Sequence, residues 1–174
     1  TKKVYGWPED SSFLVPDGVR EAFAAQVGAR GRKLSGEWTA LFAKYKQEHA
    51  ALAAELELIF KGELPAGWDK AIPVFPADAK GMATRDAGGK TINALAPQIP
   101  WLVGGSADLA PSTKTLMTFE GAGHFSAESY GGRNMHFGIR EHAMGSLVNG
   151  MSLAGLRSFG ATFLIFSDYL RPTL

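Results

Sequence analysis

The residues best suited to chemistry lie in two segments of the second half of the chain. Residues 104–112 contain Asp108 and Ser112, and residues 138–141 end at Glu141. A carboxyl group can transfer a proton and a hydroxyl group can donate a hydrogen bond to a ligand. Each residue also has an ordinary structural interpretation, since Glu141 suits the N-terminal charge of a helix and Asp108 suits a turn or helix cap.

Histidine and cysteine content narrows the possible chemistry. The sequence has no cysteine, which excludes disulfides, thiolate catalysis and cysteine-based zinc sites. Of the histidines, His49 is expected on a polar helix face and His124 in a long loop, while His136 and His142 lie close to Glu141 in the sequence. We assign no role to any of the four.

The elements that must position these residues alternate between strands and helices. Short apolar runs at residues 100–103, 134–138 and 157–159 predict strands, and helices are expected at 85–96, 139–153 and from Thr162 onward, the first of them capped by Thr84. This alternation predicts an α/β fold with a parallel sheet. In such sheets ligands bind beyond the carboxyl ends of the strands, where both chemical segments begin. The long loop over residues 104–132 also favours a functional role there.

The first third of the chain reads as helical. Asp17 is expected to cap a helix over residues 19–27 that ends at Gly28 and Gly31, and a longer helix is expected from Ser35 to Gly62. Residues 63–81 hold three prolines and no periodicity. We therefore predict a domain boundary there, with residues 1–62 and 63–174 in different domains. From the sequence, we expect both termini to be internal positions of a longer protein.

Charge and hydropathy exclude several classes of function. Lys and Arg number 18 against 17 for Asp and Glu, so no electrostatic footprint for nucleic acid or an anionic membrane is visible. No apolar stretch is long enough for a membrane span. The lack of cysteine is compatible with a reducing compartment, and a cytoplasmic location is expected.

Two motifs carry a resemblance to a known family. The segment Gly104-Gly-Ser-Ala-Asp-Leu-Ala-Pro-Ser112 resembles the transketolase loop that reaches cofactor and substrate. The segment Arg133-Asn-Met-His-Phe-Gly-Ile-Arg-Glu-His-Ala-Met-Gly145 resembles the segment around that family's catalytic glutamate. The likeness runs essentially end to end and implies the central part of a transketolase. Its parallel-sheet thiamine-diphosphate-binding fold would be partial, comprising the end of the diphosphate domain, with connector helices, and the first part of the pyrimidine domain.

The resemblance implies a role for each matched residue. Glu141 would bind N1′ of the aminopyrimidine ring of thiamine diphosphate and so enable loss of the thiazolium C2 proton. Arg85 and Ser112 would bind the substrate phosphate, since the planar guanidinium and the hydroxyl both donate to phosphate oxygens. Cofactor contacts are expected from Asp108, Leu109, Phe163, Phe166 and Tyr169. On spacing alone, the three aromatic residues would instead suggest core packing along one helix.

The resemblance also implies partners and leaves alternatives open. A divalent cation (Mg or Ca) would be bound by the N-terminal domain, whose diphosphate motif is absent here, so no metal ligand is expected in this chain. The family forms its active sites between two subunits of a homodimer and acts on sugar phosphates. The alternatives are a dihydroxyacetone synthase-type ketol transferase, an inactive structural fragment, and a generic α/β phosphate binder.

Overall fold

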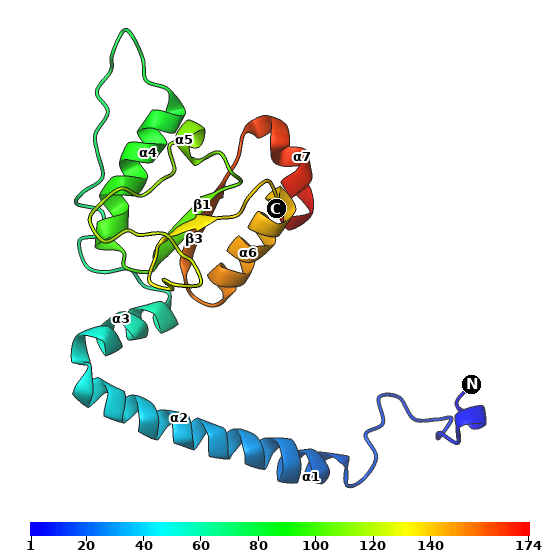
Figure 1. Ribbon diagram of the computed structural model, residues 1–174. Helices are drawn as coiled ribbons and strands as arrows, with labels where there is room; N and C mark the ends of the chain where they lie inside the picture. Colours follow the sequence, from blue (N-terminus) through cyan, green and yellow to red (C-terminus); the bar gives the residue numbers. More distant parts are fainter. The chain divides into compact units, whose positions relative to one another are not determined.

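A computed structural model describes all residues, 1–174, and the chain divides into two compact units. The first is Thr1–Ala54 and the second is Glu55–Leu174 (Figure 1). No helix is both long and apolar enough to cross a membrane.

The first unit is helical. Its elements are the 3₁₀-helix η1 (Lys3–Tyr5), α1 (Val19–Phe23), the π-helical turn η2 (Ala24–Gly28), α2 (Ala29–Glu48) and the start of α3 (Ala50–Lys61). The helix predicted to end at Gly28 instead runs on into α2, because Gly28 adopts ordinary helical angles. A glycine inside a helix costs only about 1 kcal/mol relative to alanine, so it does not force an end.

Two further local predictions for these helices are wrong. Gly18, not Asp17, precedes α1, and no side chain caps that helix. The long helix expected from Ser35 to Gly62 is interrupted at His49, whose backbone leaves the helical region between α2 and α3. Its end at Gly62 is confirmed, with a left-handed φ of +70° that glycine adopts without steric cost.

The second unit contains a parallel sheet in the order β2-β1-β3, which confirms the predicted α/β class. In the register, Gly104 of β1 lies opposite Asn134 of β2 and Phe159 of β3. Besides the end of α3, the elements of this unit are α4 (Thr84–Leu95), η3 (Ala96–Gln98), β1 (Leu102–Ser106), α5 (Ala110–Thr113), β2 (Asn134–His136), α6 (Glu141–Leu153), β3 (Arg157–Ala161), η4 (Leu164–Phe166), α7 (Ser167–Leu170) and η5 (Arg171–Thr173).

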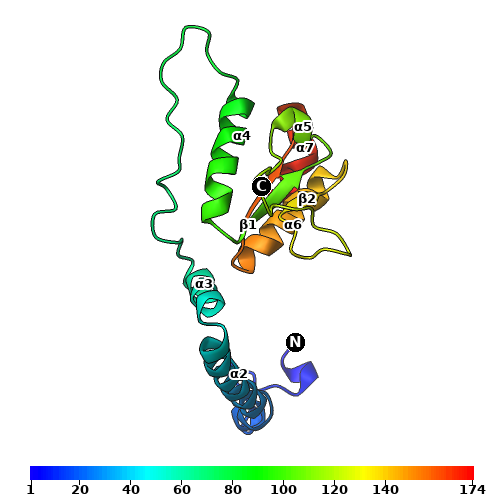
Figure 2. The same ribbon diagram turned by 60° about the vertical axis from the view of Figure 1, so that its left-hand side comes forward.

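Helices cover both faces of the sheet. On one face, Ile92 of α4 and Ala96 pack with Met117 and Phe159. On the other, Met144 of α6 packs with side chains that include Phe137, Met135 and Leu170. Figures 1 and 2 show α4 and α6 on opposite sides of the strands. Because both faces are buried, the strands read as apolar or glycine-rich runs rather than alternating ones.

The glycines of β1 are required by close strand packing. A Cβ built on Gly105 would lie 1.8 Å from the carbonyl oxygen of Met135, and one on Gly104 would lie 2.3 Å from that of Phe159. Neither neighbour can move without breaking the sheet, because both contacts are to backbone. This explains why the strand extends through a glycine pair at which the sequence pattern had predicted it to end.

Arg133 and Asn134 hold the amino end of the sheet together. The Arg133 guanidinium donates hydrogen bonds to the carbonyl oxygens of Ala96, Ile99 and Leu102 at 2.7–2.9 Å. Burial lowers the pKa of Arg133. The buried Asn134 amide accepts from the Met117 backbone N–H and donates to its carbonyl, both at 2.8 Å. These bonds join η3, β1, β2 and the long loop.

The chain after β3 departs from the predicted continuous helix. Phe163 is extended, and the following residues form the short helices η4, α7 and η5. No side chain caps any of the three. Pro172 also lacks the N–H that a continuous helix would need. The aromatic residues Phe163, Phe166 and Tyr169 therefore do not share one helical stripe.

Candidate functional site

The carboxyl ends of the three strands converge on one edge of the sheet. Asp108 and Leu109 follow β1, Glu141 lies just beyond β2, and Thr162 directly follows β3. Because β1 lies between β2 and β3, the segments that leave these strands diverge and leave a crevice at this edge. The two segments that the sequence singled out are therefore neighbours in space.

Glu141 is the first residue of α6 and is only 6% exposed. Its Oε1 atom accepts a hydrogen bond of 3.1 Å from the Thr162 hydroxyl. The amino end of a helix favours negative charge, because the first backbone N–H groups lack partners within the helix. Burial of a carboxyl group at this point is unusual for a residue that serves only as a surface charge.

The turn after β1 places Asp108 in a left-handed conformation, with φ of +61°. The backbone N–H of the next residue, Leu109, donates to the Ser106 hydroxyl at 3.1 Å. Aspartate tolerates this region better than most residues, yet it is sparsely populated for any residue with a Cβ. Asp108 is exposed at the edge of the sheet.

One cavity, of about 530 Å³, collects most of the residues predicted to bind the cofactor. Its lining is Ala107, Asp108, Leu109, Ile139, Glu141, Phe166 and Tyr169. Phe163 is not part of this lining, but its ring stacks on that of Phe166, with centroids 6.4 Å apart and an interplanar angle of 18°. The cavity thus combines two carboxyl groups with aliphatic and aromatic surface. That composition suits a flat heteroaromatic ring that carries hydrogen-bonding nitrogens.

Arg85 and Ser112 are also brought together, away from that lining. The Arg85 Nη1 atom lies 3.5 Å from the Ser112 carbonyl oxygen, at the outer limit of a hydrogen bond. Arg85 is exposed near the start of α4, and Ser112 is half-buried in α5. The predicted Thr84 cap is wrong, because Ala83 precedes the helix and no side chain caps it.

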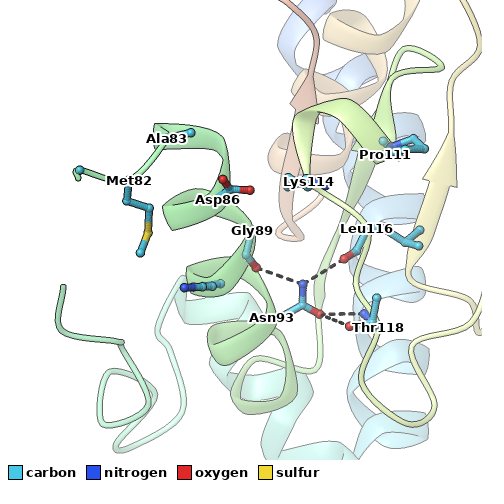
Figure 3. A pocket seen from close by; sticks show the side chains of 12 residues that line it. Met82, Ala83, Asp86, Gly89, Asn93, Pro111, Lys114, Leu116 and Thr118 are labelled. Carbon is cyan, nitrogen blue, oxygen red and sulfur yellow. Dashed lines mark hydrogen bonds between the residues drawn. The ribbon is translucent and has the colours of Figure 1, made fainter. Parts of the chain in front are cut away.

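Asn93 fixes the spacing between α4 and the loop after α5, which lie on two sides of a neighbouring cavity of about 780 Å³ (Figure 3). Its amide donates to the carbonyl oxygens of Gly89 and Leu116 at 3.0 Å and accepts from the Thr118 N–H at 2.7 Å. Gly89 permits this approach, because a Cβ there would lie 2.5 Å from the Lys114 carbonyl oxygen. The elements that carry Arg85 and Ser112 are therefore held in a defined relation.

Sequence reasoning missed a histidine pair at the same edge. Nδ1 of His124 and Nε2 of His136 are 2.8 Å apart, and both residues line a third cavity together with Asp108. The position of His136, as the last residue of β2, was the available signal. Its pairing with His124 depends on the path of the long loop, which no local pattern specifies. No group of three or more His, Cys, Asp or Glu residues is placed to hold a metal ion.

Family models of two transketolase domains match the chain. The model of the transketolase pyrimidine-binding domain matches residues 80–174, and the model of the transketolase thiamine diphosphate-binding domain matches residues 1–65.

Individual relatives agree with these matches. The chain is 50% identical to a transketolase of Bacillus subtilis and 42% identical to a chloroplastic transketolase of Arabidopsis thaliana, over its whole length in both cases. It spans 26% and 23% of those two proteins. A structure of a transketolase from Pichia stipitis in complex with sedoheptulose 7-phosphate superposes with a TM-score of 0.85 at 38% identity, covering 99% of this chain and 26% of that one. The chain belongs to the transketolase family.

Proposed function

We propose that this chain is part of a thiamine-diphosphate-dependent enzyme that transfers a two-carbon ketol unit from a ketose phosphate to an aldose phosphate. The observation that carries the proposal is the cavity at the carboxyl edge of the sheet, where Glu141 faces the same space as Phe166 and Tyr169. Membership in the transketolase family supports it. A site built only for phosphate would need cations or backbone N–H groups in place of two carboxyl groups.

The cavity fits the pyrimidine part of that cofactor. Leu109 and Ile139 supply aliphatic surface, and the Phe166 ring supplies an aromatic face on which a heterocycle can stack. Glu141 is the one buried carboxyl group in the lining, so it is the group that would meet a ring nitrogen away from water. Asp108, in its strained turn, would contact the cofactor at the open side of the cavity.

Each of these residues would perform a distinct task. When bound, thiamine diphosphate supplies the nucleophile that accepts the two-carbon unit. Glu141 would hold and share a proton at the pyrimidine N1′ position, and Asp108 and Leu109 would orient the ring. Phe163 would act indirectly, through its stacking on Phe166. Tyr169 would close the side of the cavity against water.

Arg85 and Ser112 would bind the phosphate group of the sugar. The Arg85 guanidinium lies beside the Ser112 backbone carbonyl, and this proximity supports a shared role for the two residues. Arginine suits this task because its planar fork donates two parallel hydrogen bonds to phosphate oxygens. The complex of the Pichia stipitis relative with sedoheptulose 7-phosphate supports a phosphorylated ketose as the class of substrate.

The remaining features of the complete enzyme are also proposals. A divalent cation, Mg or Ca, would accompany the cofactor diphosphate and be bound by residues outside this chain. The active site would form between two subunits of a homodimer. The domain boundary near residue 62 stays a prediction. So does a cytoplasmic location, since the Arabidopsis thaliana relative is chloroplastic.

Reconstitution tests the function directly. The 174-residue chain alone should show no ketol transfer from a phosphorylated ketose, and transfer should appear when the segment bearing the diphosphate and metal site is supplied. Sustained transfer by the isolated chain would contradict the proposal. Formaldehyde as acceptor separates the alternatives: efficient use would favour a dihydroxyacetone synthase. Cofactor titration identifies a generic phosphate binder, which would bind sugar phosphate with or without thiamine diphosphate.

A further inference from the structure

We infer that Thr162 is a positioning residue for Glu141: its hydroxyl holds one carboxyl oxygen and so commits the other to the cofactor. The inference rests on the proposed function, because it concerns how the chain presents the carboxyl group that would meet the pyrimidine ring.

The hydrogen bonding of Glu141 is asymmetric. Thr162 donates to Oε1 at 3.1 Å, and no other hydrogen bond reaches the carboxyl group. Yet no buried side-chain oxygen or nitrogen in the structure lacks a partner. Oε2 must therefore keep access to solvent, although Glu141 as a whole is only 6% exposed. Glu141 also lines the cavity at the carboxyl edge of the sheet, so the inference places Oε2 on the cavity side.

This asymmetry leaves one carboxyl oxygen available to a ligand. A threonine hydroxyl has a single hydrogen, and here that hydrogen points to Oε1. While Thr162 donates to Oε1, Oε2 is the oxygen left to exchange a proton with a ring nitrogen in the cavity. The carboxyl group can donate this proton to a ring nitrogen and take it back without rotating. A carboxyl group lacking the Thr162 bond would be free to present either oxygen.

Thr162 is itself held by the sheet. The carbonyl oxygen of Ala161, the residue before it, accepts from the Ala107 N–H and from the Ser106 hydroxyl, both at 3.0 Å. The same Ser106 oxygen accepts from the Leu109 N–H at 3.1 Å. The buried Ser106 thus ties the end of β3 to the turn that carries Asp108. The backbone that carries Thr162 is therefore positioned by strand pairing.

Replacement of Thr162 tests the inference in the intact transketolase that contains these residues. Thr162→Val keeps the branched shape and removes the donor, whereas Thr162→Ser keeps the donor. We expect Thr162→Val to slow hydrogen exchange at the cofactor C2 position by about 10- to 100-fold, the range of a hydrogen bond to a charged group. The KM for the sugar phosphate should stay within about twofold, because Arg85 and Ser112 are untouched. Thr162→Ser should stay within about threefold of the parent rate.

The dissociation constant of thiamine diphosphate, measured by calorimetry, provides a readout that does not depend on turnover. It should rise several-fold in Thr162→Val and be nearly restored in Thr162→Ser. In a Glu141→Gln background, Thr162→Val should cause little further change in cofactor binding, because the amide has no carboxyl oxygen to exchange a proton with the ring nitrogen and so leaves nothing for Thr162 to position. If Thr162→Val does not fold, as judged by its Tm, Thr162→Ala supplies the same comparison with fewer atoms to place.

The outcomes separate the inference from the function on which it rests. If Glu141→Gln exchanges the C2 hydrogen at the parent rate, the proposed function of the site is wrong. If Glu141→Gln is impaired but Thr162→Val matches the parent, the positioning role alone is overturned. Fully additive effects of Thr162→Val and Glu141→Gln on cofactor binding would also overturn it.

Discussion

The two ends of the parallel sheet are built differently. At the amino end, the Arg133 guanidinium donates to three carbonyl oxygens through Nε and Nη2, and the Asn134 amide uses both its donor and its acceptor. At the carboxyl end, Glu141 has one hydrogen-bonded oxygen, Asp108 lies in a left-handed turn, and His124 pairs with His136 beside an open cavity.

We infer from this difference that the amino end of the sheet serves stability and that the carboxyl end serves ligand binding. Fully matched buried polar groups make a region rigid, and removal of one partner leaves the others desolvated and unpaired. Polar groups that keep one free bonding position, or that adopt a strained backbone, are the kind that a ligand can complete. Substitutions at the amino end should therefore lower the free energy of unfolding, whereas substitutions at the carboxyl end should impair cofactor binding or activation.

The largest effect is expected at the carboxyl end. Glu141→Gln should slow C2-hydrogen exchange on bound thiamine diphosphate by about 10²- to 10⁴-fold, the range for loss of a positioned acid–base group. The free energy of unfolding should change by less than about 1 kcal/mol, since the amide keeps the shape and can still accept from Thr162. Isotope exchange followed by NMR measures the first quantity and urea denaturation the second. Glu120→Gln, at an exposed glutamate, is the matched control and should leave both unchanged.

The reverse pattern is expected at the amino end. Arg133→Met should lower the free energy of unfolding by roughly 2–4 kcal/mol, because the carbonyl groups of Ala96, Ile99 and Leu102 lose their charged, half-buried donor. The fraction that remains folded should exchange the C2 hydrogen at nearly the parent rate. Arg171→Met, which removes only an exposed ion pair with Asp168, should cost about 1 kcal/mol or less. If Arg133→Met kept the parent stability but no longer bound thiamine diphosphate, the two ends of the sheet would not have the separate roles inferred here.

Phosphate binding should show an intermediate effect at a third place, on α4 and α5. Arg85→Lys keeps the charge but loses the planar fork, so the KM for a phosphorylated ketose should rise about tenfold. Ser112→Ala should raise it about two- to fivefold, the range for one neutral hydrogen bond. An unphosphorylated ketose serves as the control substrate and should respond to neither change. Equal losses with both substrates would show that Arg85 has another role.

The smallest overall effect is expected at Asp108. Asp108→Gly relieves the left-handed conformation but adds freedom to the unfolded chain, so the free energy of unfolding should stay within about 1 kcal/mol of the parent. The dissociation constant of thiamine diphosphate should nevertheless rise several-fold, because the side chain is lost from the cavity. Asp108→Asn, which suits the same backbone region, keeps the shape and tests the contribution of the charge. Unchanged cofactor affinity in Asp108→Gly would remove Asp108 from the site.

The sequence predicted those parts of the fold and site that depend on short-range pattern. The parallel α/β class followed from alternating apolar runs and helices, and the location of the site followed from the rule that ligands bind beyond strand ends. Glu141 and Leu109, which lie in the segments that this rule indicated, line one cavity with Phe166, which only the resemblance to transketolases had assigned to the cofactor. The roles predicted for them still await experiment.

What the sequence could not predict depends on contacts between distant segments. Thr162 meets Glu141 across 21 positions, and Ser106 meets Ala161 across 55. Neither residue type nor spacing predicts such contacts, because they form only when β3 lies beside β1. The helix predicted from Thr162 onward failed for a related reason. The aromatic spacing of three was compatible with one helix, whereas the structure divides the segment into short turns that aim Phe166 and Tyr169 into the cavity.

A structure of the complete enzyme with thiamine diphosphate bound tests the central claim most directly. The decisive quantity is the distance between the nearer Glu141 carboxyl oxygen and N1′ of the pyrimidine ring. We predict a hydrogen bond of about 2.6–3.2 Å from Oε2, with Oε1 still bonded to Thr162. A Glu141 side chain turned away from the ring and paired with a cation elsewhere in the protein would contradict the account.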